Sequence, residues 1–188
     1  MQQTGEYRIA ATREKVWLAL NDPQVLAQCI DGCQSMTKVA DDAYTTSIKA
    51  KVGPVSATFG ADLNLTDLDP PSGYTLNASV KGGAAGFGKG TARVSLVDDG
   101  GATILRYQVD GNVGGKLAQV GSRLIDGAAR KMADDFFRKF GEAVAPGQSA
   151  KVEVAAGPAQ TNGYERSGQR IIWIIVFVVL ILAIVLAM

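Results

Sequence analysis

The chain has 188 residues and a formal net charge of +1, from 19 Lys and Arg against 18 Asp and Glu. This balance predicts no nucleic-acid partner and neither an acidic nor a basic tail. The sequence contains no histidine. It therefore excludes Ser-His-Asp and Cys-His nucleophilic sites and most zinc sites, in which imidazole is the base or the ligand. We expect no catalytic residue and no metal site.

The N-terminal part of the chain predicts one strand, two short helices and two further strands. The first helix begins at Thr12, a residue type that caps helices, and turns Val16 and Trp17 to one side. Asp22 and Pro23 have the residue types preferred at the N-cap and first position of the second helix. The predicted strands lie at residues 4–9, 34–39 and 44–52, and the predicted helices lie at residues 12–20 and 22–29.

Period-two alternation dominates the middle of the chain. Residues 55–66 place apolar side chains on one face and polar side chains on the other, which is typical of a half-buried antiparallel strand. Further strands are predicted at residues 74–80, 91–97 and 103–110, separated by turns rich in Asp, Pro and Gly. The sheet should therefore contain about seven antiparallel strands.

A long helix is predicted at residues 116–143, because its apolar side chains form a band that drifts slowly round the helix. Such a helix fits across the concave face of a curved sheet, which predicts an α+β domain at residues 1–145. Gly121 lies on the side that should face the sheet, with Ala128 nearby. These small residues leave two interpretations open: a ligand cavity at Gly121, or close backbone packing there.

The C-terminal part of the chain predicts a tether and a membrane anchor. Residues 146–170 show no sustained period and predict a flexible linker of about 25–30 Å. Residues 171–188 contain no charged residue and would form a helix of roughly 27 Å, enough for a single transmembrane tail anchor. Arg166 and Arg170 precede this span, so we expect a cytoplasmic-membrane protein whose N-terminal domain is cytoplasmic.

A cytoplasmic domain keeps its cysteines reduced, so Cys29 and Cys33 are expected to be thiols. Their i, i+4 spacing leaves two interpretations, ordinary packed thiols or a metal or redox pair. The segment Gly83 to Lys89 matches the phosphate-binding pattern GxxxxGK, but Gly90 follows where a nucleotide site needs Ser or Thr. The segment also lies between two predicted strands, so we interpret it as a loop at the cavity rim with Phe87 as a lid.

The chain resembles the CoxG family of carbon monoxide dehydrogenase subunits, within the START-like (SRPBCC) helix-grip superfamily. The segments that carry the resemblance are TGEYRI, REKVWLALNDP, KAKVGPVSA, LTDLDPP, GGAAGFGKG and VGGKLAQVGSRLIDGAARKMADDFF. They occur in order over most of residues 4–140. Asp31 departs from the family pattern, in which proline is expected at this position.

The resemblance implies a curved antiparallel sheet wrapped round a long C-terminal helix. It also implies an accessory protein that attaches a molybdenum-containing carbon monoxide dehydrogenase, or a related molybdenum hydroxylase, to the cytoplasmic membrane. The tail anchor expected from residues 171–188 agrees with this independently.

Candidate site residues fall into two groups. Residues expected to line an apolar cavity lie on predicted inward faces or near its rim: Trp17, Phe59, Leu63, Tyr74, Leu76, Phe87, Tyr107, Leu117, Val120, Gly121 and Leu124. Three cations recur every seven residues along the predicted long helix, at Lys116, Arg123 and Arg130. They are either a solvated face of the helix or a docking stripe for an acidic partner or lipid headgroups.

The leading hypothesis is a non-catalytic, membrane-anchored adaptor that recruits carbon monoxide dehydrogenase. Its cavity would bind a lipophilic ligand, a respiratory quinone such as menaquinone or ubiquinone, and so couple the enzyme to the respiratory chain. The alternatives are a recruitment or assembly factor without a ligand, a lipid-binding protein that serves another partner, and an enzyme acting on a lipid-like substrate.

Overall fold

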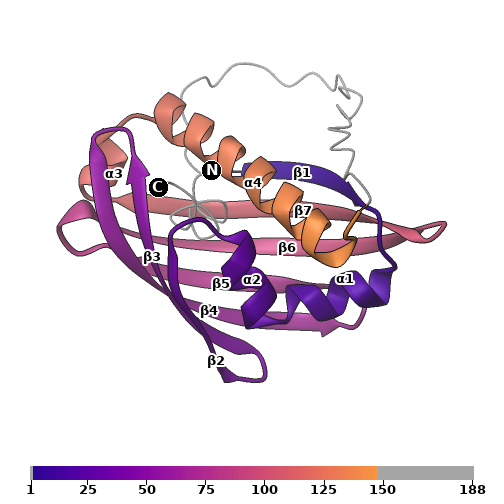
Figure 1. The fold of residues 1–188 in the computed structure, drawn as a ribbon. Coiled ribbons are helices and arrows are strands. Elements are labelled where there is room, and N and C mark those ends of the chain that lie inside the picture. The colour runs from indigo at the N-terminus through magenta and orange to yellow at the C-terminus, as the bar shows by residue number, and fades with distance from the viewer. Residues whose placement is uncertain (1, 148–188) are drawn as a thin grey trace, which may run out of the picture.

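The computed structural model describes residues 2–147, which fold into a seven-stranded antiparallel sheet and several helices (Figure 1). The sheet order is β1-β7-β6-β5-β4-β3-β2. The strands are β1 (Gln2–Ile9), β2 (Cys33–Ala40), β3 (Ala43–Val52), β4 (Val55–Asp69), β5 (Gly73–Lys81), β6 (Phe87–Asp99) and β7 (Ala102–Gly114). The helices are α1 (Arg13–Leu20), α2 (Pro23–Cys29), the 3-10 turn η1 (Gly83–Ala85), α3 (Lys116–Gln119) and α4 (Ser122–Val144).

The curved sheet and the helix that crosses it follow from the alternation in the sequence. Six of the seven strands follow one another through hairpin connections from β2 to β7, and β1 then pairs with β7 at the far edge. Inward residues of β3 to β7 are buried at every second position, and α4 lies across the face that they form (Figure 1). The α+β helix-grip architecture predicted from the sequence is confirmed for this part of the chain.

The start of the second helix is also confirmed, because Asp22 accepts a hydrogen bond from the backbone N–H of Gln24 at 2.8 Å. Asp31, the position at which the resemblance led us to expect proline, contacts the long helix. Its carboxylate forms an ion pair with Lys139 of α4. This pair attaches the turn after α2 to the long helix, although half-exposed ion pairs contribute little to stability.

The prediction of a single helix at residues 116–143 is wrong in one respect, because the helix is interrupted at Gly121. This residue is the N-cap of α4 and has a φ of 94°. Glycine reaches that region without steric cost, whereas an α-helix requires a negative φ. Lys116 therefore lies on α3, apart from Arg123 and Arg130 on α4. The three cations do not form a stripe along one continuous helix.

No helix among residues 2–147 is long and apolar enough to cross a membrane. Residues 148–170 of the linker predicted at residues 146–170, and the predicted tail anchor at residues 171–188, lie outside the described residues.

Candidate functional site: an apolar cavity

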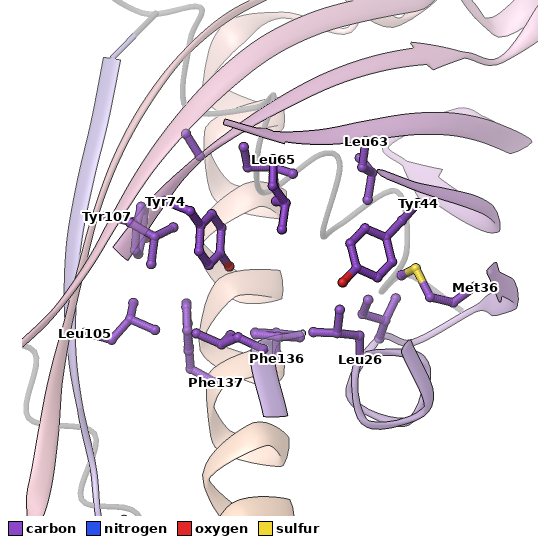
Figure 2. Close-up of a pocket in the computed structure, with 15 residues that line it drawn as sticks. Leu26, Met36, Tyr44, Leu63, Leu65, Tyr74, Leu105, Tyr107, Phe136 and Phe137 are labelled. Carbon is purple, nitrogen blue, oxygen red and sulfur yellow. The ribbon is translucent and has the colours of Figure 1, made fainter. Parts of the chain in front are cut away.

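A cavity of about 90 Å³ lies between the sheet and the helices (Figure 2). Its lining is aliphatic and aromatic, apart from tyrosine hydroxyl groups. The sheet contributes Tyr44, Leu63, Leu65, Tyr74, Leu76, Ala92, Val94, Leu105 and Tyr107. The helices, the residue after α2 and the edge strand β2 contribute Leu20, Leu26, Ile30, Met36, Phe136 and Phe137. The site can therefore bind an apolar group and offers it few polar contacts.

The hairpin registers explain why the sheet residues share one wall. Tyr44 of β3 lies opposite Leu63 of β4, and Leu65 lies opposite Leu76 of β5. Directly paired residues project from the same face of a sheet, so these side chains stand side by side. The same alternation places Tyr74 opposite Val94 on the next strand.

Stacked aromatic rings close the cavity beneath α4. Phe137 stacks on Tyr7 with ring centroids 4.0 Å apart and lies 6.0 Å from the ring of Tyr107. The Tyr7 hydroxyl donates a hydrogen bond to Asp134 at 2.9 Å, which joins β1 to α4. Burial raises the pKa of Tyr7 and of Tyr107, and the nearby Arg130 partly opposes this rise in the pKa of Tyr107. Both phenols therefore stay protonated at neutral pH.

Two tyrosine hydroxyl groups point into the cavity, those of Tyr44 and Tyr74 (Figure 2). The Tyr44 hydroxyl donates to the backbone carbonyl of Asn21 at 3.2 Å. The Tyr74 hydroxyl has no hydrogen-bond partner among the described residues, and burial raises its pKa. It therefore remains a protonated donor, available to an acceptor atom in the cavity.

Four of the residues expected in the cavity line it: Leu63, Tyr74, Leu76 and Tyr107. Trp17 lies one layer behind, because its ring packs edge-on against Tyr74 with centroids 5.8 Å apart. Phe59 and Leu117 are buried in the core near the other end of the sheet, where Phe59 packs against Gly82.

The remaining expected residues lie at the end of the domain near α3. Phe87 is 61% exposed and its ring lies over Gly114. Leu124 is 58% exposed, and Val120 is half-buried near the turn at Gly53. Gly121 faces open space rather than the sheet. The cavity expected at Gly121 is therefore misplaced, because the break in the helix turns this residue away from the sheet.

Several residues that line the cavity were not predicted from the sequence. The sequence pattern could have identified some of them, but not others. Tyr44 and Leu65 lie on strands that were predicted correctly, at inward positions, so extending the alternation would have found them. Phe136 belongs to the apolar band of the long helix. Leu26 and Met36 carry no such signal, because α2 and the edge strand β2 reach the cavity only through the tertiary fold.

The cysteines are free thiols, with Cys29 buried and Cys33 half-buried. Burial raises the pKa of Cys29 to about 11, although Lys139 opposes the rise. A thiol with a raised pKa is a poor nucleophile and a poor metal ligand at neutral pH. Within residues 2–147 no three His, Cys, Asp or Glu side chains are grouped so that they could hold a metal ion. The structure thus favours packed thiols.

A curved antiparallel sheet that grips one long helix over an apolar cavity defines a helix-grip protein of the START-like class. Solved structures agree. A conserved protein from Geobacillus kaustophilus is 32% identical, with a TM-score of 0.72, covering 77% of this chain and 95% of that chain. An aromatase/cyclase from Streptomyces sp. R1128 is 11% identical, with a TM-score of 0.58, covering 77% and 93%. At this identity the second likeness shows the fold alone.

The family itself follows from the sequence match. The model of the carbon monoxide dehydrogenase CoxG subunit matches residues 5–145, and the chain belongs to the CoxG family. Membership indicates a role together with carbon monoxide dehydrogenase, as an accessory protein. No curated protein matches the chain.

Proposed function

We propose that this protein is a membrane-anchored adaptor that recruits carbon monoxide dehydrogenase, or a related molybdenum hydroxylase, and holds the ring of a respiratory quinone in its cavity. The observation that carries the proposal is the apolar cavity with one protonated, unpartnered hydroxyl at Tyr74 among the described residues. A quinone is a flat apolar ring with carbonyl acceptors. The ring matches the aliphatic and aromatic walls, and a carbonyl oxygen matches the Tyr74 donor.

The volume of the cavity imposes a condition on this proposal. A cavity of about 90 Å³ is smaller than the roughly 150 Å³ that holds benzene in a protein core, so ring binding requires the wall to move. Leu26 on α2 and Met36 on β2 are half-buried residues of the wall that lie outside the central strands. Methionine adapts readily to new shapes, and β2 is an edge strand paired only with β3. We expect α2 and β2 to move outward when the ligand binds.

The membrane part of the proposal rests on residues 171–188. Their length and lack of charge support a tail anchor, and the arginines at 166 and 170 support a cytoplasmic domain at the inner membrane. A tethered domain with an apolar cavity would reach a quinone dissolved in the bilayer. It would present that quinone to an enzyme that must pass electrons to the respiratory chain.

The experiment has two measurements on the full-length protein. Mass spectrometry of solvent extracts of the protein purified from its native membrane should detect menaquinone or ubiquinone. Calorimetric titration with a short-chain quinone should then show that Tyr74→Phe lowers affinity by roughly 2- to 10-fold, the value of one hydrogen bond. Tyr44→Phe is the matched control, because the Tyr44 hydroxyl already donates to Asn21 and should contribute less.

A recruitment factor without a ligand is the second candidate, and the small volume of the cavity favours it. The two functions give different results. Extracts without a quinone, together with no quinone binding by titration, would leave recruitment alone. Equal losses of affinity in the Tyr74 and Tyr44 variants would contradict the specific role of Tyr74 while keeping the cavity as the site.

A further inference from the structure

The turns at one end of the sheet are acidic. Antiparallel hairpins place alternate turns at opposite ends, so the β2–β3, β4–β5 and β6–β7 connections lie together. Each carries a pair of exposed carboxylates: Asp41 and Asp42, Asp67 and Asp69, and Asp98 and Asp99. Arg8 and Lys38 pair with Asp99 and Asp41 there, at 2.7 and 3.8 Å, and the carboxylates still outnumber these cations. We call this region the acidic end.

The turns at the opposite end contain no acidic residue. They are the β3–β4 turn at Gly53 and Pro54, the β5–β6 connection at residues 82–86, and Gly115 between β7 and α3. Exposed cations flank all three turns and the start of α4: Lys51, Lys81, Lys89, Lys116 and Arg123. Lys81 pairs with Asp62 at 3.7 Å, so the other four cations carry most of the positive charge. We call this region the basic end. The domain therefore has opposite charge at its two ends, although its composition is almost neutral.

Exposed apolar side chains at the basic end indicate which kind of surface it can contact. Phe87 and Leu124 are 61% and 58% exposed. Phe87 lies over Gly114, close to η1 and the start of α3, and Leu124 lies beside the turn at Gly53. Other large apolar side chains are exposed elsewhere in residues 2–147, but Val39, Leu68 and Val97 lie next to the acidic turns. Leu18 is 70% exposed and lies on α1, at the far end of α4 from the basic end (Figure 1). Among these side chains, Phe87 and Leu124 are the ones that stand beside clustered cations.

We infer that the basic end is a docking surface for anionic phospholipid headgroups, with Phe87 and Leu124 entering the interface between headgroups and acyl chains. Clustered Lys and Arg are attracted to a negatively charged leaflet, and aromatic and leucine side chains bury favourably at its boundary. The carboxylates of the acidic end are repelled by the same surface. The charge separation therefore orients the domain, with the basic end toward the lipid and the acidic end away from it.

The position of the C-terminus is compatible with this orientation, which uses the tail anchor of the proposed function. The helix α4 begins beside α3 and runs toward α1, so the described chain ends far from the basic end (Figure 1). Its 23 residues span roughly 35 Å. Residues 148–170 would reach about 75–80 Å if fully extended. That length exceeds the helix about twofold, so a chain anchored at residue 171 can still bring the basic end to the bilayer.

Hydrogen–deuterium exchange of the full-length chain tests the inference. The protein is combined with nanodiscs of phosphatidylcholine alone, or of phosphatidylcholine with phosphatidylglycerol. We expect slower exchange at residues 82–90 and 115–125 in the anionic discs only, with no change at residues 40–43 and 98–101. The double variant Phe87→Ser, Leu124→Ser should lose this protection. Leu68→Ser, Val97→Ser is the matched control, because it removes two exposed apolar side chains at the acidic end and should keep the protection.

The double variant Lys89→Glu, Lys116→Glu tests whether the positive charge is required. It should remove the protection at residues 82–90 and 115–125 without altering exchange in the core strands. Equal exchange in the two lipids, or protection at the acidic turns instead, would overturn the inference and leave the basic end to a protein partner. The test does not depend on the anchor, because a chain that fails to insert is simply mixed with the discs. Failure of the tail to insert would count against the proposed function alone.

Discussion

The space between the sheet and α4 differs between its two halves. In the half near α3, Phe59, Ile48 and Ile125 are almost completely buried. In the half near α1 and α2, larger aromatic side chains surround a cavity. We call these the packed half and the cavity half. The half with more aromatic surface is thus the one that retains empty space.

The side chains that α4 presents to the sheet explain this difference. Ala129 is fully buried on α4, and such a small residue lets the helix approach the sheet closely. Phe137, by contrast, stacks on Tyr7 and stands 6.0 Å from Tyr107, so rigid rings hold the elements apart. Small residues thus remove space by bringing backbones together, whereas stacked rings preserve it.

The largest expected effect is in the packed half. Phe59→Ala should lower the free energy of unfolding by about 3–5 kcal/mol, because it removes a fully buried ring and the surroundings cannot collapse into the gap. Chemical denaturation of the purified protein measures this value. A loss below about 1 kcal/mol would show that the packed half can rearrange, and would weaken the contrast with the cavity half.

A matched pair of insertions compares the halves directly. Ile48→Phe in the packed half should cost about 1–3 kcal/mol through overpacking. Leu65→Phe in the cavity half should cost less, because the cavity accommodates the larger ring, and it should also weaken quinone binding. Thermal denaturation and titration of both variants provide the two readouts. Equal destabilisation would indicate that the cavity wall is as rigid as the packed core.

Gly121 tests the cavity position expected from the sequence. Gly121→Phe should cost about 1–3 kcal/mol, because the backbone there has a φ of 94° that only glycine adopts readily. Quinone affinity should stay at the wild-type value, since this residue faces open space outside the cavity. Abolished binding in a folded variant would return the ligand site to this end of the domain.

Alkaline pH should lower the free energy of unfolding mainly through the cavity half, which contains Tyr7 and Tyr74. Burial raises the pKa of both phenols above the ordinary value near 10, so the unfolded chain loses these protons first as pH rises. The contribution of these two tyrosines to stability should therefore be constant below about pH 9 and fall above it, by about 1.4 kcal/mol per pH unit for each tyrosine. Unfolding curves from about pH 8 to 11 should show a shallower fall in Tyr74→Phe. An unchanged slope would mean that Tyr74 ionises normally in the folded protein.

Much of the fold was determined locally by the sequence. Alternation at period two identified the strands and their inward faces, and Leu63, Tyr74, Leu76 and Tyr107 accordingly lie on the cavity wall. Hairpin order follows from short turns, because sequential antiparallel strands need only a few connecting residues. The CoxG resemblance is confirmed by the family match over residues 5–145.

Only the tertiary structure decided the position of the cavity, the break before α4 and the charge at the two ends of the sheet. An empty volume depends on how side chains from α2, β2, α4 and the sheet together fill a shared space, which no local period encodes. The helical periodicity of the sequence continues across Gly121, although the backbone at this residue is not helical. Likewise, evenly distributed Asp and Lys along the chain become two opposite poles only when the antiparallel strands bring alternate turns together.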